Sequence, residues 1–311
     1  MKQARRNTLI ALSFIICLLS FSTTLCSCSS DDETAADTQE DSNGRRMRQL
    51  TISNVSMATR ATIDGETLAA GWEEGDKATY FNLTLQGQPF GQMTQGILTA
   101  HPSAASGDDP EGASATLSGS VYCGLGDYLA VIYPAVTIEG SAENAYFTIN
   151  LSGQKGTLAD IGARYHYIFG MGDVESVNGG TATATIANDE YSYVKSLLSL
   201  CKFTFSKEVK GLEINEYISD PSNKLGYSQG KVSIPASPTL SAVSVKPVAN
   251  DQALIVDLSA NPSKDVYVAM LPDAKTYHFK VTYNDDSTAE FTKRANLLEG
   301  KYYELQLTQQ Q

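Results

Sequence analysis

Apolar and polar residues alternate along much of the chain from Leu50 onward. The segment 201–206 (CKFTFS) sets cysteine and phenylalanine against lysine, threonine and serine, and the segments 277–283 (YHFKVTY) and 302–307 (YYELQL) repeat the pattern. Because successive side chains of a β-strand point to opposite faces of its sheet, this alternation predicts half-buried strands. Turn-forming residues such as NDDS after Tyr283 separate these strands and predict a hairpin there. The pattern therefore indicates an all-β protein.

One segment departs from the period of two. In residues 188–200 (NDEYSYVKSLLSL), apolar side chains recur at helical spacing after a capping residue, Asn188 or Asp189. We therefore expect a short helix that leads into the strand at residue 201. Many short strands around one helix favour two β-sandwiches joined near residue 190, with domains at residues 50–188 and 189–311. The length of the chain also favours two hydrophobic cores over one.

The N-terminus has the pattern of an export signal. Lys2, Arg5 and Arg6 precede an almost unbroken apolar run from Leu9 to Phe21. That run is shorter than the roughly 20 residues that a helix needs to span a bilayer. A basic start followed by a short apolar run is typical of a secretory signal peptide, which we favour over a buried core helix.

The apolar run leads to Leu25-Cys26-Ser27-Cys28, which resembles the bacterial lipobox, in which an apolar residue and two small residues precede a lipid-bearing cysteine. On this interpretation Cys28 accepts the lipid, and residues 1–27 leave as a lipoprotein signal peptide. Lipid on Cys26 would instead place the bulky Leu25 where a small residue is wanted. The resemblance implies a diacylglycerol on the Cys28 sulfur and a further acyl chain on the new N-terminus, which together would anchor the chain stably in the outer membrane.

Residues 28–49 are expected to form a disordered tether, because they are polar and lack aromatic side chains. Three acids, Asp31, Asp32 and Glu33, follow Cys28 closely. They are either solvated tether residues or a cluster that resembles the tag that exports such lipoproteins to the outer face of the cell. The formal net charge of the full chain is −12, and removal of the basic signal makes it more negative. So acidic a chain is not expected to bind nucleic acid.

Few residues carry a recognisable chemistry. The three histidines, His101, His166 and His278, are far apart and form no zinc-ligand pattern, and the sequence contains neither a nucleophile elbow nor a phosphate-binding loop. The aspartate pairs at 108–109 and 285–286 stand in turn-like stretches, which favours turn capping over a glycosidase pair or a calcium site. We therefore expect no catalytic activity, no cofactor and no metal.

Cys123 and Cys201 remain beside Cys28 after the predicted processing. Neither belongs to a C-x-x-C motif. They are either two small buried apolar residues, which we favour, or the two ends of one disulfide.

Five motifs in order along the chain resemble the fimbrillin (Mfa-like) family of bacterial surface lipoproteins. The first joins Thr59-Arg60-Ala61 to Trp72-Glu73-Glu74-Gly75-Asp76. The others are VIYPA (131–135), QKGTLADI (154–161), LLSLCKFTF (197–205) and LLEGKYYELQL (297–307). Together they extend from residue 59 to residue 307, across most of the chain.

The resemblance implies two transthyretin-like β-sandwich domains in tandem and a role as a fimbrial (pilus) subunit or a fimbria-associated adhesion protein. The implied partners are other fimbrial subunits, the outer membrane through the lipid on Cys28, and a ligand on a host or bacterial surface. A protease specific for arginine would cut between Arg60 and Ala61 and release the strand 50–59. A strand from the next subunit would then fill the vacated groove by β-strand addition, and the C-terminal residues 302–311 would be, or lie beside, such a donor strand.

Two alternatives stay open at this point. Cleavage after Arg60 would separate the body from its lipid, so an anchor subunit would keep Arg60 uncut, as a solvated strand residue. A surface glycan-binding lipoprotein of a nutrient-uptake system would share the lipobox, the tether and the β-rich body. That function needs an exposed aromatic platform, and the sequence has 16 tyrosines but a single tryptophan.

Overall fold

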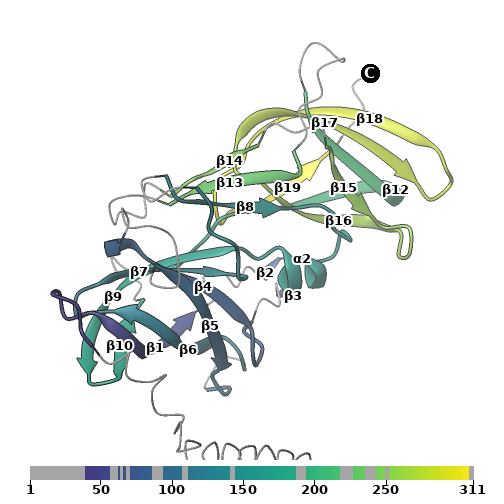
Figure 1. Ribbon diagram of the computed structural model, residues 1–311. Coiled ribbons are helices and arrows are strands. Elements are labelled where there is room, and N and C mark those ends of the chain that lie inside the picture. The colour runs from purple at the N-terminus through teal and green to yellow at the C-terminus, as the bar shows by residue number, and fades with distance from the viewer. Residues whose placement is uncertain are drawn as a thin grey trace, which may run out of the picture. The chain divides into compact units, whose positions relative to one another are not determined.

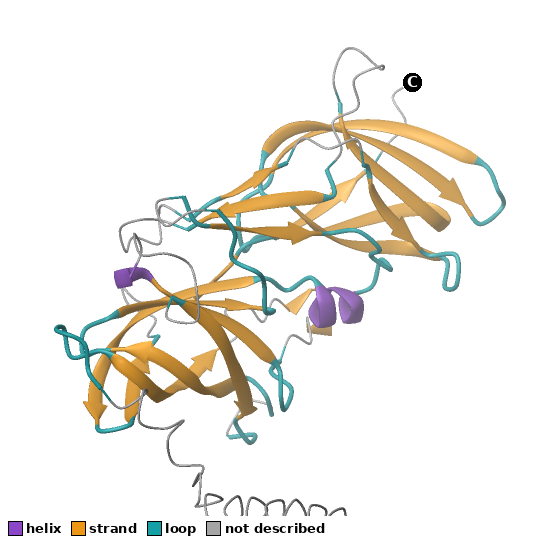
Figure 2. Ribbon diagram, in the orientation of Figure 1, coloured by secondary structure: helices purple, strands orange, loops and turns teal. Residues whose placement is uncertain are grey.

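The computed structural model describes residues 39–56, 62–63, 66–67, 71–85, 94–106, 111–140, 144–186, 194–217, 227–234, 243–248 and 252–307. Residues 42–311 belong to one compact unit. Strands make up most of the described chain, with one α-helix and one 3-10 turn among them (Figure 2). The prediction of an all-β protein is confirmed.

The first sheet closes on itself. Its strands are ordered β10-β1-β6-β5-β4-β7-β9-β11, and β10 also pairs with β9, so that the strands from β10 to β9 form a ring to which β11 is attached (Figure 1). Buried side chains of these strands, among them Leu50, Leu98, Leu117 and Leu129, form one cluster. The sequence did not predict this closure, which depends on a parallel pairing of β1 with β10. The strands are β1 (Arg46–Ser56), β4 (Lys77–Asn82), β5 (Gln95–Pro102), β6 (Ser114–Cys123), β7 (Tyr128–Tyr133), β9 (Ile168–Asn178), β10 (Thr181–Thr185) and β11 (Val194–Ser196).

The second group of strands forms two sheets. In the larger one, β15, β16, β17 and β19 all pair with the long strand β12, and β18 pairs with β17. The smaller sheet has the order β14-β13-β8. The strands are β8 (Tyr146–Asn150), β12 (Ser199–Glu216), β13 (Gln229–Ser233), β14 (Val245–Pro247), β15 (Leu254–Asp257), β16 (Ser263–Met270), β17 (Ala274–Tyr283), β18 (Thr288–Asn296) and β19 (Tyr302–Gln306). The shorter elements elsewhere are β2 (Thr62–Ile63), β3 (Glu66–Thr67), the 3-10 turn η1 (Leu83–Leu85) and the helix α2 (Leu158–Arg164).

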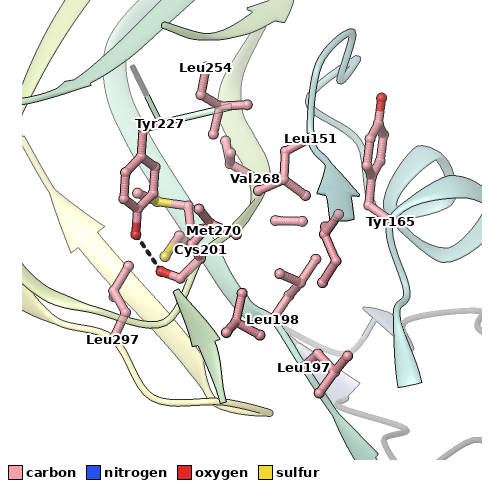
Figure 3. Close-up of a cluster of buried hydrophobic side chains, with 14 of the residues drawn as sticks. Leu151, Tyr165, Leu197, Leu198, Cys201, Tyr227, Leu254, Val268, Met270 and Leu297 are labelled. Carbon is pink, nitrogen blue, oxygen red and sulfur yellow. Dashed lines mark hydrogen bonds between the residues drawn. The ribbon is translucent and has the colours of Figure 1, made fainter. Parts of the chain in front are cut away.

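A second buried cluster joins these two sheets and extends to the first sheet and to α2. Phe203 of β12 and Phe279 of β17 lie with ring centroids 5.2 Å apart. Figure 3 shows Cys201, Tyr227 and Met270 gathered in the same cluster. The two clusters share no buried residue, but the second also includes Phe81, Ile132 and Phe169 of the first sheet, so the second group of strands packs against that sheet as well as within itself.

The segment 154–156 (QKG) joins the edge of the larger sheet. The Gln154 side chain donates to the Ala269 carbonyl oxygen (2.9 Å) and accepts from the Ala269 amide (2.8 Å), as a neighbouring strand would. The Tyr267 amide donates to the Gly156 carbonyl oxygen (2.9 Å). Thr157 then caps α2, because its hydroxyl accepts from the Asp160 amide at 3.2 Å. The QKGTLADI motif therefore has a structural role.

The helix predicted at residues 188–200 is wrong wherever the structure describes that segment. Residues 194–196 form β11, which pairs with β9, and β12 begins at Ser199. Leu197 and Leu198 are both buried between the two strands. The apolar run thus reflects burial on both sides of the chain rather than one face of a helix, two patterns that short segments do not distinguish. Residues 187–193 lie outside the described residues.

Two element boundaries differ from the expected ones. Strand β1 begins at Arg46, inside the segment expected to be tether. Its alternation of buried and exposed side chains already includes Arg48, which is buried. Strand β8 lies before the expected domain boundary at residue 188, yet it pairs with β13, which lies after that boundary. The expected β17–β18 hairpin is confirmed, with Phe279 opposite Phe291.

Candidate functional site

The predicted site residues surround β1 in the sequence. Cys28, Arg60 and Ala61 all lie outside the described residues. Arg60 falls four residues after the end of β1 at Ser56 and two residues before β2 begins at Thr62. The candidate site is therefore β1 together with the strands that hold it.

Strand β1 is covered along both of its edges. It pairs with β6 in antiparallel register from Arg46 opposite Cys123 to Ser56 opposite Ser114. On its other edge it pairs in parallel with β10, from Gln49 beside Thr181 to Ile52 beside Ala184. Without β1, the facing edges of β6 and β10 would lose their backbone hydrogen-bond partners.

The inner face of β1 belongs to the core of the first sheet. Leu50 and Ile52 are 0% exposed, and Val55 is 1% exposed. A bulge lies between Ile52 and Val55, where β1 has one residue more than β6, and Asn54 takes a positive φ of 57° there. Asparagine tolerates this conformation better than most residues. The bulge keeps Val55 on the buried face although it is three positions after Ile52.

Trp72 holds the C-terminal end of β1. Its indole Nε1 donates to the Val55 carbonyl oxygen at 2.8 Å, and its ring is buried. The ring packs against Tyr133 with centroids 4.7 Å apart. The turn that follows Trp72 depends on Gly75, which has a φ of 85°. The Trp-x-x-Gly-Asp motif therefore fixes the end of β1 that leads to Arg60.

Two arginines hold the N-terminal end of β1. The Arg45 guanidinium contacts the buried Asp127 carboxylate, with Nη2 2.7 Å from Oδ1. Arg48 is 2% exposed and donates to the carbonyl oxygens of Gly179 (3.2 Å), Gly44 (3.1 Å) and Cys123. These contacts join the start of β1 to the turns at one end of the ring.

Sequence reasoning missed these arginines, because both fall within residues 28–49, which it assigned to the tether. One signal was available for Arg48, since it lies two positions before Leu50 and continues the alternation of β1. No local pattern links Arg45 to Asp127, which is 82 positions away.

The predicted donor strand is β19, and it is held less firmly than β1. It pairs in parallel with the first part of β12, from Leu200 beside Tyr302 to Thr204 beside Gln306. In the described part of the chain it pairs with no other strand. Tyr302, Tyr303 and Leu305 are only partly buried. Residues 308–311 lie outside the described residues.

The two cysteines and Asp285, which were also considered for chemistry, have structural surroundings, whereas Asp108 and Asp109 lie outside the described residues. Cys123 and Cys201 are both buried and free, so the disulfide alternative is wrong. Burial raises the pKa of the Cys123 thiol to about 11. Asp285 caps the β17–β18 turn, where its carboxylate accepts from the Ser287 amide at 3.1 Å.

The described residues hold neither a group of metal ligands nor a membrane-spanning helix. Within them, no three or more His, Cys, Asp and Glu side chains come together in a group that could hold a metal ion. In the same part of the chain, no helix has the length and apolar character needed to cross a bilayer.

Comparisons with known proteins matched structures and not sequences. No protein-family model and no curated protein matches the chain. The structure is similar to the tip fimbrial protein Mfa3 of Porphyromonas gingivalis, with 6% identity, a TM-score of 0.38, and coverage of 84% of this chain and 94% of that one. It is also similar to a candidate cell adhesion protein of Bacteroides eggerthii, with 9% identity, a TM-score of 0.36, and coverage of 84% and 85%. A candidate adhesin of Bacteroides ovatus follows, with 9% identity, a TM-score of 0.31, and coverage of 83% and 89%.

Proposed function

We propose that this protein is a lipid-anchored cell-surface fimbrial subunit or fimbria-associated adhesion protein that assembles by β-strand addition and has no enzymatic activity. One observation carries the proposal: β1 closes the first sheet between β6 and β10, and the chain that leaves β1 contains Arg60. The ordered motifs that resemble fimbrillins support it from the sequence.

Cleavage at Arg60 would change how β1 is attached. Hydrolysis of the peptide bond between Arg60 and Ala61 consumes one water and leaves a carboxylate on Arg60 and an amine on Ala61. Strand β1 would then be held to the rest of the chain only by non-covalent contacts, and another strand could compete for its place. A competitor with alternating apolar side chains would restore the backbone hydrogen bonds to β6 and β10 and refill the pockets of Leu50 and Ile52.

The replacement has to be complete, because an open groove is unstable. With β1 gone, two strand edges and the pockets of three buried side chains would face water. Such edges pair readily with other chains, so a donor strand stabilises the groove and joins two subunits in one step.

The same cut decides the fate of the lipid. We propose that residues 1–27 are the signal peptide, that Cys28 carries the lipid and that the residues between Cys28 and Arg45 connect it to the body. A chain cut after Arg60 loses this anchor and is free to enter a fimbria, whereas an uncut chain stays at the outer membrane as an anchor subunit. Asp31, Asp32 and Glu33 would direct the lipoprotein to the outer face of that membrane.

The body would consist of two transthyretin-like domains in tandem, residues 50–188 and 189–311. The cluster inside the first sheet supports a first domain, whereas the second cluster includes Phe81, Ile132 and Phe169 of the first segment as well as residues of the second. The pairing of β8 with β13 ties the end of the first segment to the second. The partners would be other fimbrial subunits and a ligand on a host or bacterial surface.

Incubation of the purified lipoprotein with an arginine-specific protease tests this function. We expect a new N-terminus at Ala61 and, once other fimbrial subunits are added to the cut protein, a ladder of oligomers that survives detergent, since each donor strand would be fully enclosed. Mapping of the N-terminus on intact cells should find acylated Cys28 for an anchor subunit or Ala61 for a polymerising one.

The matched control is Arg60→Gln, which keeps the length of the side chain but removes the protease's recognition group. This variant should keep its lipid and form no ladder. A chain that is cut at Arg60 but never assembles, together with unchanged adhesion of cells that lack the gene, would contradict the proposal.

A further inference from the structure

A buried carboxylate lies at the end of the groove that β1 occupies. The Asp127 side chain is 2% exposed and sits in the turn between β6 and β7. Its oxygens accept from the Gly124 amide (3.0 Å) and from the Asn82 side chain (3.0 Å). These neutral donors orient the carboxylate but do not balance its charge.

The balancing charge comes from the segment that leads into β1. Arg45 Nε lies 2.8 Å from Oδ1 and 2.9 Å from Oδ2 of Asp127, and Arg45 Nη2 lies 2.7 Å from Oδ1. Two guanidinium nitrogens thus meet the carboxylate, a geometry that arginine provides and lysine does not. The Arg45 side chain is only 15% exposed, so solvent screens the pair weakly.

Loss of β1 would leave the Asp127 carboxylate without this cation. Removing one partner of a buried ion pair is strongly destabilising, because the remaining charge stays in a site that water solvates poorly. A replacement strand that fills the apolar pockets but brings no cation would therefore bind less well than β1.

We propose that Asp127, with Asn82 and the Gly124 amide, is a guanidinium-binding site that selects the strand entering the groove. The site accepts a strand with an arginine five positions before its first fully buried apolar residue, as Arg45 precedes Leu50. This inference rests on the proposed function, because it assumes that another strand can replace β1.

The site also sets the register of the incoming strand. A slip by one residue turns every side chain of a strand to the opposite face. The pockets of Leu50 and Ile52 alone would accept a slip by two residues at a modest cost. A guanidinium bound to Asp127 excludes that slip, because it fixes one end of the strand.

The C-terminal segment of the chain does not meet this requirement. Residues 295–311 contain no arginine, and their one cation is Lys301, four positions before Leu305. The C-terminal strand of a second copy is therefore a poor donor for the groove. The partner that fits is a different subunit, whose donor strand carries an arginine before its alternating apolar residues.

Peptide exchange on a cut chain tests the site. Residues 57–61 are replaced by the recognition sequence of a protease that cuts nowhere else in the chain, so that the cut does not depend on Arg60. The nicked protein is then loaded with a fluorescent peptide of residues 43–56, and its dissociation is followed in the presence of excess unlabelled peptide.

We expect the peptide with Arg45→Gln to dissociate roughly 100-fold faster than the unchanged peptide, as the loss of one partner of a buried ion pair predicts. The peptide with Arg46→Gln loses the same charge one position away, from a half-buried side chain that is not among the contacts of Asp127, and should dissociate clearly more slowly than the Arg45→Gln peptide. A peptide of residues 298–311 should not displace the labelled strand. On an Asp127→Asn protein, the difference between the Arg45→Gln and unchanged peptides should largely disappear.

Equal dissociation of the Arg45→Gln and Arg46→Gln peptides would overturn the site, as would a difference that persists on Asp127→Asn. If the Asp127→Asn protein does not fold, the comparison of peptides on the unchanged protein decides. If no peptide ever exchanges, strand addition is overturned instead. The site is then tested on the intact chain by double-mutant cycles. The losses in unfolding free energy caused by Arg45→Gln and Asp127→Asn must depart more from additivity than the losses caused by Arg46→Gln and Asp127→Asn.

Discussion

The strands β1 and β19 stand near the two ends of the described chain, and each pairs in parallel with a neighbour, but they are held in opposite ways. Strand β1 has a partner on both edges, and three of its side chains are at most 1% exposed. Strand β19 has one partner, β12, and its apolar side chains are half-buried. Strand β1 is part of a closed ring, whereas β19 is a strand at the edge of its sheet.

This difference suits the two roles that strand addition requires. A groove that binds a strand tightly needs two edges and deep pockets, and the surroundings of β1 provide both. A strand that leaves its own subunit must do so at a modest cost in free energy. Strand β19 meets this condition, because it pairs along one edge and its apolar side chains are only half-buried. The comparison predicts that the same substitution has a large effect in β1 and a small effect in β19.

The largest effect is expected for removal of a leucine side chain. Leu50→Ala leaves a cavity in the core of the ring and should lower the free energy of unfolding by roughly 2–5 kcal/mol. Leu305→Ala should cost only about 1 kcal/mol, because that side chain is half-exposed. Urea denaturation of both variants, followed by circular dichroism, measures the two losses. Equal losses would remove the distinction between the strands.

The next effect concerns acid, and it acts near β19. His166 is 4% exposed and lines a small cavity of about 40 Å³ together with Lys301 and Tyr302 at the start of β19. Burial lowers the pKa of His166 to about 4. The unfolded chain takes up a proton near pH 6.5 that the folded chain takes up only near pH 4, so stability falls as the pH drops through that window, by up to roughly 3 kcal/mol.

The variant His166→Gln isolates this effect from the titration of carboxylates. Denaturation of both proteins at pH 7.5 and pH 4.5 should show a smaller loss for the variant, whatever its absolute stability. A pH dependence identical to that of the unchanged protein would contradict the prediction. If, as the pH falls, amide hydrogen exchange becomes faster in β19 before it does in β1, acid loosens the donor strand first.

The smallest effects are expected when one hydrogen bond is removed at each of the two strands. Trp72→Phe leaves the buried Val55 carbonyl oxygen without the indole donor, which should cost about 1–3 kcal/mol. Tyr303→Phe removes the hydroxyl that accepts from the Leu298 amide at 2.9 Å, where the contact is exposed and water can replace it. That loss should be under about 1 kcal/mol. Thermal unfolding of the pair measures both, and a larger loss for Tyr303→Phe would reverse the ranking of the two strands.

Local patterns predicted most of the strands and failed where tertiary contacts dominate. The alternation in residues 277–283 predicted β17 and its hairpin with β18, because the period of a half-buried strand is visible in a few residues. Residues 194–200 have apolar side chains on both faces, and the sequence alone did not separate a fully buried strand pair from a helix. The motif around Arg60 indicated that the strand before it matters. The ion pair of Arg45 with Asp127 was not predictable, because the two residues are 82 positions apart and no local pattern connects them.

The sequence by itself determined that the chain is built of strands, that its N-terminus has the pattern of an exported lipoprotein, and that Arg60 follows the first strand. These features depend on the order of neighbouring residues. Only the tertiary structure decided that β1 closes a ring, that Arg45 and Arg48 belong to it rather than to a tether, and that β19 stays at an edge. The reason is physical: pairing and burial depend on which distant strands meet, and a strand's own alternation does not specify its partners.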